Sequence, residues 1–245
     1  CPMTWSADAP PMIMGLYPYI RNGENRGFKP GLMAEVAASL ACNPFYAQRM
    51  IFLTANGDMA ARLESLGLAV TRTFEDAPEH VWHDTAHKMK HWMGLWALRE
   101  FGEYLWVDWD TVATGEPDAE FWAACRVAGM PKFIRIPGYK HAVVNCGVLY
   151  VPGSWAGAME RSFHLSAASP NDEHLWETIL PSDVLTRPEF WFGPEVQYIS
   201  GVERLEKVTR RLRFAHFGRG NFDAAEAIRE AHRMASQTKE EPNAA

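Results

Sequence analysis

Asp108 and Asp110 are the residues whose types and spacing point most directly to chemistry in this sequence. They stand one residue apart after residues 104–107, a short run of apolar strand formers. Side chains alternate along an extended segment, so the two carboxylates are expected to point the same way. Converging carboxylates are hard oxygen ligands of the kind that Mg²⁺ and Mn²⁺ prefer. The pair predicts a divalent cation site at the carboxyl end of a buried strand.

The elements around this pair support a ligand site there. Apolar residues recur at three- and four-residue spacing over 88–102, which predicts a helix leading into the strand. Open α/β sheets bind their ligands at the carboxyl ends of such strands. Acidic residues after a strand are also common in ordinary turns, so the D-x-D pattern alone leaves that alternative open.

Alternating strands and helices are expected along most of the chain. This pattern predicts an α/β fold with a mixed, mostly parallel sheet flanked by helices. Strands are expected at 12–17, 50–54, 68–70, 132–136, 142–151 and 212–215, a turn at 111–117, and helices at 32–40, 59–66, 118–126 and 223–237. A single domain is expected at 1–237, followed by a disordered polar tail at 238–245.

Three segments resemble the motifs of GT-A nucleotide-sugar glycosyltransferases, those of retaining family 8 in particular. Residues 104–112 read YLWVDWDTV, like the family's DxD strand, and residues 143–152 read VVNCGVLYVP, like its N-x-G strand. Residues 214–221 read FAHFGRGN, like its late H-F-x-G segment, although the Lys-Pro-Trp that follows in family 8 is missing here. The three motifs occur in the family's order, and they imply a Rossmann-like GT-A domain.

The resemblance implies that His216 completes the metal site with Asp108 and Asp110. A set of one imidazole and two carboxylates favours Mn²⁺, with Mg²⁺ as the alternative. Without the resemblance, His216 reads as a hydrogen-bonded residue near the surface. Three histidines at four-residue spacing, His83, His87 and His91, also suggest zinc, but a polar helix face explains them more simply.

The resemblance also implies contacts to the nucleotide. Asp108, Gly218 and Arg219 are implied at the donor diphosphate, and so is a lysine on the preceding helix. Lys88 and Lys90 are the candidates, and a solvated lysine is the alternative for either. The base is expected at the end of the first strand, where Tyr17 flanks it or forms part of a surface aromatic pair.

Three further residues are implied at the transferred sugar. Asn145, in the middle of an expected buried strand, needs a hydrogen-bond partner, which is the donor sugar, the acceptor or the backbone. Asp172 or Glu173 is implied to meet sugar hydroxyls, while an acidic first turn is equally typical of helix capping.

Composition narrows the class of protein. A net charge of −6 over 245 residues argues against nucleic acid as a partner. The four cysteines are scattered without a C-x-x-C pair, which favours a reduced, cytoplasmic chain. No apolar run is long enough to span a membrane. Because the sequence starts at Cys1, an anchor outside it stays open.

The predicted function is a metal-dependent glycosyltransferase that moves a sugar from a nucleoside diphosphate, expected to be UDP, to a carbohydrate or other hydroxyl acceptor. One alternative is a sugar-phosphate nucleotidyltransferase, which needs a glycine-rich basic loop after the first strand. The other is a non-catalytic carbohydrate-binding protein that uses some of the ten tryptophans.

Overall fold

The computed structural model describes the chain in segments. These are residues 9–17, 20–21, 24–25, 33, 37, 40, 49–78, 81, 86–113, 117–136, 144–165, 172–199 and 213–217. The helix expected at 223–237, the tail expected at 238–245 and two expected phosphate contacts, Gly218 and Arg219, lie outside the described residues. The single domain at 1–237 stays a prediction.

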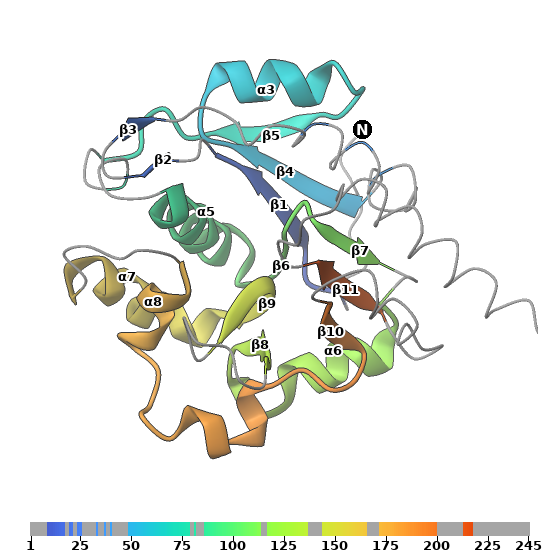
Figure 1. Cartoon of the computed structure of the whole chain (residues 1–245), viewed down its shortest axis with the longest axis vertical. Helices are drawn as coiled ribbons and strands as arrows, with labels where there is room; N and C mark the ends of the chain where they lie inside the picture. Colours follow the sequence, from blue (N-terminus) through green and yellow to red (C-terminus); the bar gives the residue numbers. More distant parts are fainter. Residues whose placement is uncertain are drawn as a thin grey trace, which may run out of the picture.

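A six-stranded sheet forms the centre of the molecule, in the order β5-β4-β1-β6-β9-β8 (Figure 1). Its strands are β1 (Met12–Leu16), β4 (Met50–Thr54), β5 (Val70–Thr73), β6 (Glu103–Val107), β8 (Lys132–Ile134) and β9 (Asn145–Pro152). The strands from β5 to β6 pair in parallel, whereas β9 runs antiparallel to both β6 and β8. This mixed, mostly parallel sheet confirms the predicted fold class.

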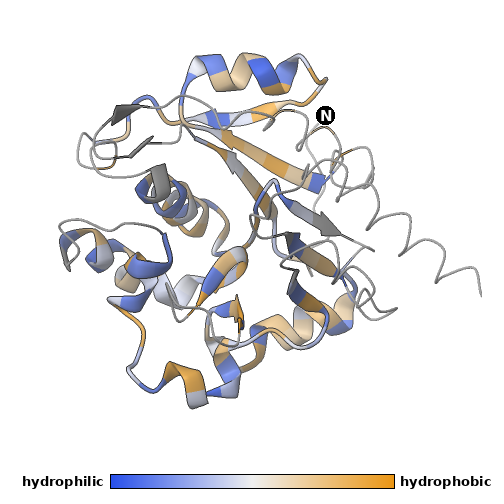
Figure 2. Cartoon of the chain, in the orientation of Figure 1, coloured by the Kyte–Doolittle hydropathy of each residue, from blue (hydrophilic) through white to orange (hydrophobic). Residues whose placement is uncertain are grey.

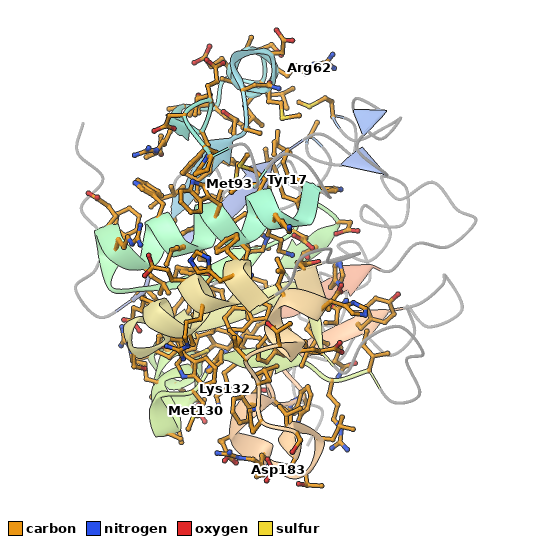
Figure 3. The ribbon with its side chains drawn as sticks, turned by 90° about the vertical axis from the view of Figure 1, so that its left-hand side faces the viewer. Tyr17, Arg62, Met93, Met130, Lys132 and Asp183 are labelled. Atoms are coloured by element: carbon orange, nitrogen blue, oxygen red, sulfur yellow. The ribbon has the colours of Figure 1, made fainter. Side chains whose placement is uncertain are left out.

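Helices flank the sheet. They are α3 (Gly57–Glu64), α5 (Ala86–Phe101), α6 (Ala119–Arg126), α7 (Ala156–Leu165) and α8 (Asp172–Glu177), with short 3₁₀ turns at Val127–Gly129, Gly153–Trp155, Val184–Thr186 and Pro188–Phe190. α5 packs on β6 and also contacts α7 and α8, while α3 covers β4 and β5. Figure 3 shows α5 lying across the sheet, with α7 below it. None of the described helices combines the length and the apolar composition needed to cross a membrane.

The core lies along the central strands. Every residue of β1 and β4 is buried, as expected for strands covered on both faces. Figure 2 shows these strands mostly in the hydrophobic colour. Trp106 of β6 packs directly on Gly15 of β1, where a Cβ atom would overlap the indole ring. The close contact between β1 and β6 therefore depends on a glycine at position 15.

A second sheet has three strands, two of which come from the last described part of the chain. It consists of β10 (Val196–Ile199), β11 (Phe214–Phe217) and β7 (Thr111–Ala113), with β11 in the middle. β7 begins directly after Asp110 and pairs antiparallel with β11, so that Thr111 lies opposite His216. A hairpin of Ile20–Arg21 (β2) and Glu24–Asn25 (β3) forms a separate two-stranded sheet.

Two of the expected strands are displaced along the sequence. The strand expected at 68–70 is β5, which begins at Val70 and runs through polar residues. Among the described strands, β5 stands at the edge of the sheet and its side chains are partly exposed, so it tolerates polar residues that an apolar pattern misses. The strand expected at 212–215 is β11, so His216 lies within the strand rather than after it.

Two other expectations near the site were also wrong. The turn expected at 111–117 contains a strand, β7, which three residues are too few to reveal in an apolar pattern. The described strand β9 begins at Asn145, so this residue stands at its start and not in its middle. Residues 141–143 lie outside the described residues.

Candidate metal and nucleotide site

A tight turn presents Asp108 and Asp110 at the end of β6. The backbone N–H of Thr111 donates to the carbonyl of Asp108 at 3.1 Å, and the N–H of Asp108 donates to the carbonyl of Gly147 on β9 at 2.8 Å. The expected extended backbone is therefore wrong, because the chain turns at these residues to enter β7. The turn still leaves both carboxylates close to one point.

His216 faces these two carboxylates. Its Nε2 atom lies 3.1 Å from Asp110 Oδ1 and 4.0 Å from Asp108 Oδ2. One ligand atom of each of the three residues lies within 4.8 Å of the others. Burial by itself lowers the pKa of His216, but the Asp110 and Asp108 carboxylates outweigh burial and raise the pKa above its usual value. The ring therefore sits where positive charge is favoured.

This cluster fits a divalent cation. Two carboxylates and an imidazole are the ligand types expected for Mn²⁺, with water and substrate oxygens filling the remaining positions. Burial raises the pKa of Asp108, although Lys90 partly offsets this effect. A bound cation would stabilise the charged carboxylate there. Whether the three residues bind a metal stays a prediction.

Gly147 makes room for the histidine ring. A Cβ atom at this position would overlap three ring atoms of His216. The ring can therefore lie against β9 only because residue 147 has no side chain. The N-x-G segment and the H-F-x-G segment, which the sequence offered as separate motifs, meet at this contact.

Lys90 of α5 lies next to the cluster and is almost completely buried. Its Nζ atom lies 3.0 Å from Asp108 Oδ1, 2.8 Å from Asp172 Oδ2 and 2.9 Å from the carbonyl oxygen of Cys146. Burial lowers the pKa of a lysine, but Asp108 and Asp172 raise the pKa of Lys90 well above its usual value. Lys88 is buried as well, so neither lysine is the solvated residue of the alternative reading.

Trp106 is a residue of the site that the sequence did not indicate. Its Nε1–H donates to Asp108 Oδ1 at 2.7 Å, and its ring lies 5.5 Å from Lys90 Nζ. Trp106 and Asp108 are two residues apart where β6 ends, and the hydrogen bond shows that their side chains meet there. That spacing was visible in the sequence, although nothing there identified the indole as the donor.

Asn145, Asp172 and Glu173 lie together beside the cluster, and all three are buried. Asn145 Nδ2 lies 3.4 Å from Glu173 Oε1, and Asn145 Oδ1 lies 3.0 Å from His216 Nδ1. Burial and the nearby Asp172 raise the pKa of Glu173 to about 9, so this side chain is a neutral acid at pH 7. Both acids stand in the first turn of α8, which is also where the helix-capping alternative places them.

Tyr17 follows β1 and is buried, so the surface alternative for this residue was wrong. Its ring meets the ring of Trp109 edge to face, with centroids 5.7 Å apart. Burial raises the pKa of Tyr17 well above its usual value, which keeps its hydroxyl protonated. Tyr19, its expected neighbour, lies outside the described residues.

The histidines of the zinc alternative do not form a described site. His91 is buried in α5, where its Nε2 lies 3.1 Å from the Ser162 hydroxyl and its ring packs against Phe163 and Trp176. Burial lowers the pKa of His91 to about 3, so the ring is neutral. His83 and the side chain of His87 lie outside the described residues.

Comparisons with known proteins concern the fold. No protein-family model and no curated protein matches the sequence. The structure is similar to that of a glycosyltransferase involved in the glycosylation of the major capsid of PBCV-1, with a TM-score of 0.53, 13% identity, and 92% of this chain and 100% of the other covered. It is also similar to the glycosyltransferase GlyE of Streptococcus pneumoniae TIGR4, with a TM-score of 0.52, 10% identity, and 94% and 63% covered.

A third similar structure is the bifunctional glycosyltransferase WbbM, with a TM-score of 0.53, 7% identity, and 95% of this chain and 52% of the other covered. The chain thus spans less than two thirds of GlyE and of WbbM. At these identities the likeness establishes the fold. The chain has the GT-A fold of glycosyltransferases, as the sequence motifs implied.

The raised pKa of Glu173 predicts a pH-dependent stability difference between the wild type and Glu173→Gln. The folded chain keeps a proton on Glu173 up to about pH 9, whereas an unfolded glutamate loses it near its ordinary pKa of 4.5. The wild type therefore loses stability as pH rises from about 4.5 to about 9. Glutamine stays neutral and avoids this loss.

We expect the melting temperature of Glu173→Gln, relative to the wild type, to rise steadily between pH 5 and pH 9 in EDTA. Differential scanning fluorimetry across this range measures the difference. Glu64→Gln, at an exposed position in α3, controls for the loss of one surface carboxylate. A melting-temperature difference for Glu173→Gln that stays flat over this range would contradict the prediction.

Proposed function

We propose that this protein is a metal-dependent glycosyltransferase that moves a sugar from a nucleoside-diphosphate sugar, with UDP as the nucleotide, to a hydroxyl acceptor. The observation that carries the proposal is the convergence of Asp108, Asp110 and His216 at the carboxyl end of β6 in a chain with the GT-A fold. The fold supports the reaction class, and the three ligand types support Mn²⁺, or else Mg²⁺, as the cofactor.

On the metal side of the proposed site, three side chains of the chain offer ligand atoms to a cation. A divalent cation there supplies a Lewis acid that offsets the charge developing on the leaving diphosphate. Asp108 and Asp110 offer carboxylate oxygens, and His216 offers Nε2. Lys90 and Trp106 both contact Asp108 Oδ1, which fixes the direction of its carboxylate.

The sugar is proposed to lie beside Asn145, Asp172 and Glu173. Glu173 is neutral at pH 7, so it can donate a hydrogen bond to a sugar oxygen as well as accept one. Asp172 shares Lys90 with Asp108, which joins the sugar side of the site to the metal side. No general base is assigned among the described residues.

The nucleotide is proposed to lie over the end of β1. Tyr17 and the turn that carries Trp109 are in contact there, next to the metal cluster. Lys88, Gly218 and Arg219 are proposed at the diphosphate. The Lys90 ammonium instead contacts two carboxylates and a carbonyl oxygen. A cytoplasmic location and the lack of a nucleic-acid partner stay predictions.

Nucleotide binding tests the proposal against a non-catalytic carbohydrate-binding protein. A ligand that binds only the folded state stabilises it by about 2.7 kcal/mol when its concentration is a hundred times its Kd. We expect UDP with Mn²⁺ to raise the melting temperature, and UDP in EDTA to raise it much less. A melting temperature that responds to simple sugars but not to UDP with Mn²⁺ would favour the binding protein.

Replacing one carboxylate tests the metal. We expect Asp110→Asn to lower donor hydrolysis or transfer by at least about a hundredfold, the scale on which losing a transition-state electrostatic contact lowers kcat. EDTA should do the same to the wild type, and added Mn²⁺ should restore only the wild type. Asp183→Asn, in an exposed turn of the chain, is the matched control. Full activity after EDTA treatment would exclude a required metal.

The contact between Gly147 and His216 tests the histidine ligand without touching a ligand residue. A methyl group at position 147 overlaps the ring and must displace it, so Gly147→Ala is expected to weaken Mn²⁺ binding by at least about tenfold. Manganese electron paramagnetic resonance measures the free ion. Gly157→Ala in α7, where the new Cβ meets only Arg161 at 3.7 Å, is the control. Unchanged Mn²⁺ affinity in Gly147→Ala would remove His216 from the ligand set.

A further inference from the structure

Arg135 is an exposed cation at the edge of the sheet where the candidate site lies. β8 runs parallel to β6, because each of them is antiparallel to β9, so both strands end at this edge. Ile134, the residue before Arg135, pairs with Asn145 on the sugar side of the proposed site. The Cα atoms of Arg135 and Asn145 are therefore within about 9 Å of each other, one step between strands plus one step along the chain.

The strand order places Arg135 on the side of the site away from the proposed nucleotide. The nucleotide is proposed over β1, whereas β8 lies beyond β6 and β9 (Figure 1). The proposed sugar residues Asn145, Asp172 and Glu173 come between the two. A ligand that reaches Arg135 is thus beyond the transferred sugar, where an acceptor approaches.

Among the described residues, the guanidinium group of Arg135 contacts Trp191 but has no carboxylate partner. Arg99 and Arg187, by comparison, each form an ion pair with a glutamate, at 2.9 and 2.7 Å. The chain has a net charge of −6, so its surface as a whole repels an acidic ligand. A cation without an ion pair is the kind of group that would attract such a ligand locally.

Trp191 holds this guanidinium group in place. Its ring centroid lies 5.8 Å from the guanidinium carbon, and its side chain is buried. Trp191 pairs with Phe133 of β8, and the N–H of Phe192 donates to the Phe133 carbonyl at 3.0 Å, so the ring is fixed relative to the strand. A guanidinium over an indole is attracted by the ring and keeps the N–H donors at its edge for other partners.

The chemistry of this position favours an anion. An arginine fork binds a carboxylate or a phosphate through two parallel hydrogen bonds. The acids on the sugar side do not oppose a negative charge strongly, because Glu173 is neutral at pH 7 and Asp172 pairs with Lys90. A ligand with an anionic group can therefore bind beside them.

We propose that Arg135, positioned by Trp191, binds the carboxylate or phosphate of an anionic saccharide, which is the acceptor of the transferred sugar. The role as acceptor rests on the proposed function. The preference for an anionic saccharide does not, because it depends on Arg135 and Trp191 alone. Carboxylate and phosphate share the chemistry that the arginine fork recognises, and the test separates them.

The test compares three saccharides that differ in one group: glucose, glucuronic acid and glucose 6-phosphate. Their affinities for the wild type are measured by saturation-transfer difference NMR, with and without UDP and Mn²⁺. We expect at least one of the two anionic saccharides to bind about tenfold or more tightly than glucose, the scale of a charge-assisted hydrogen bond. Which one binds more tightly identifies the anionic group.

Variants locate the preference. Arg135→Gln is expected to bind all three saccharides equally, and Arg135→Lys, which keeps the charge without the fork, to retain part of the preference. Trp191→Leu should lose most of the preference, whereas Trp191→Phe keeps a ring under the guanidinium and should retain it. Arg161→Gln, at an exposed position in α7, is the control for the loss of one arginine charge.

Equal affinities of the wild type for all three saccharides, in both conditions, would overturn the inference even if the Trp191 variants do not fold. A preference that survives in Arg135→Gln would overturn it as well. The proposed function fails separately: if UDP with Mn²⁺ does not stabilise the wild type while the anion preference depends on Arg135, the glycosyltransferase proposal falls and the saccharide site stands.

Discussion

The buried ammonium of Lys90 is the interaction on which the arrangement of the site depends. A charge inside a protein is tolerated only when partners surround it, because the cost of removing it from water is several kcal/mol. Lys90 obtains those partners from Asp108 after β6, Cys146 in β9 and Asp172 in α8, while Lys90 itself comes from α5. One side chain therefore holds four separate elements together at the site.

The candidate site also depends on the contact between two sheets. Asp108 continues from the six-stranded sheet, whereas His216 belongs to the three-stranded one, and β7 joins them because it starts directly after Asp110. The backbone bond from Asp108 to Gly147 fixes the turn against β9. The imidazole ring of His216 then packs against β9 at Gly147, which has no side chain. The candidate site is thus a product of strand pairing more than of any single loop.

The sequence allowed prediction of the features that depend on local pattern. The apolar runs of β1, β4 and β6 predicted buried strands, and helical spacing predicted α5. The motifs also predicted that Asp108, Asp110 and His216 are neighbours, and in the structure their side chains do lie close together. The choice between Lys88 and Lys90 could not be made, because the two lysines lie within one turn of α5 and the choice depends on which face of that turn lies against the site. The hydrogen bond from Trp106 and the overlap at Gly147 depend on register between strands, which periodicity does not contain.

The distance along the chain between the two halves of the cluster has a consequence for biosynthesis. Asp108 and Asp110 leave the ribosome well before His216, which lies in β11, the last described strand. Lys90 has been made before either carboxylate, so it is available as their counter-ion while the rest of the chain is still being synthesised. The imidazole of His216 joins the two carboxylates only when β11 docks against β7. The complete cluster of two carboxylates and an imidazole would therefore mark a chain in which β11 has docked, and translation products that end before β11 would lack the imidazole.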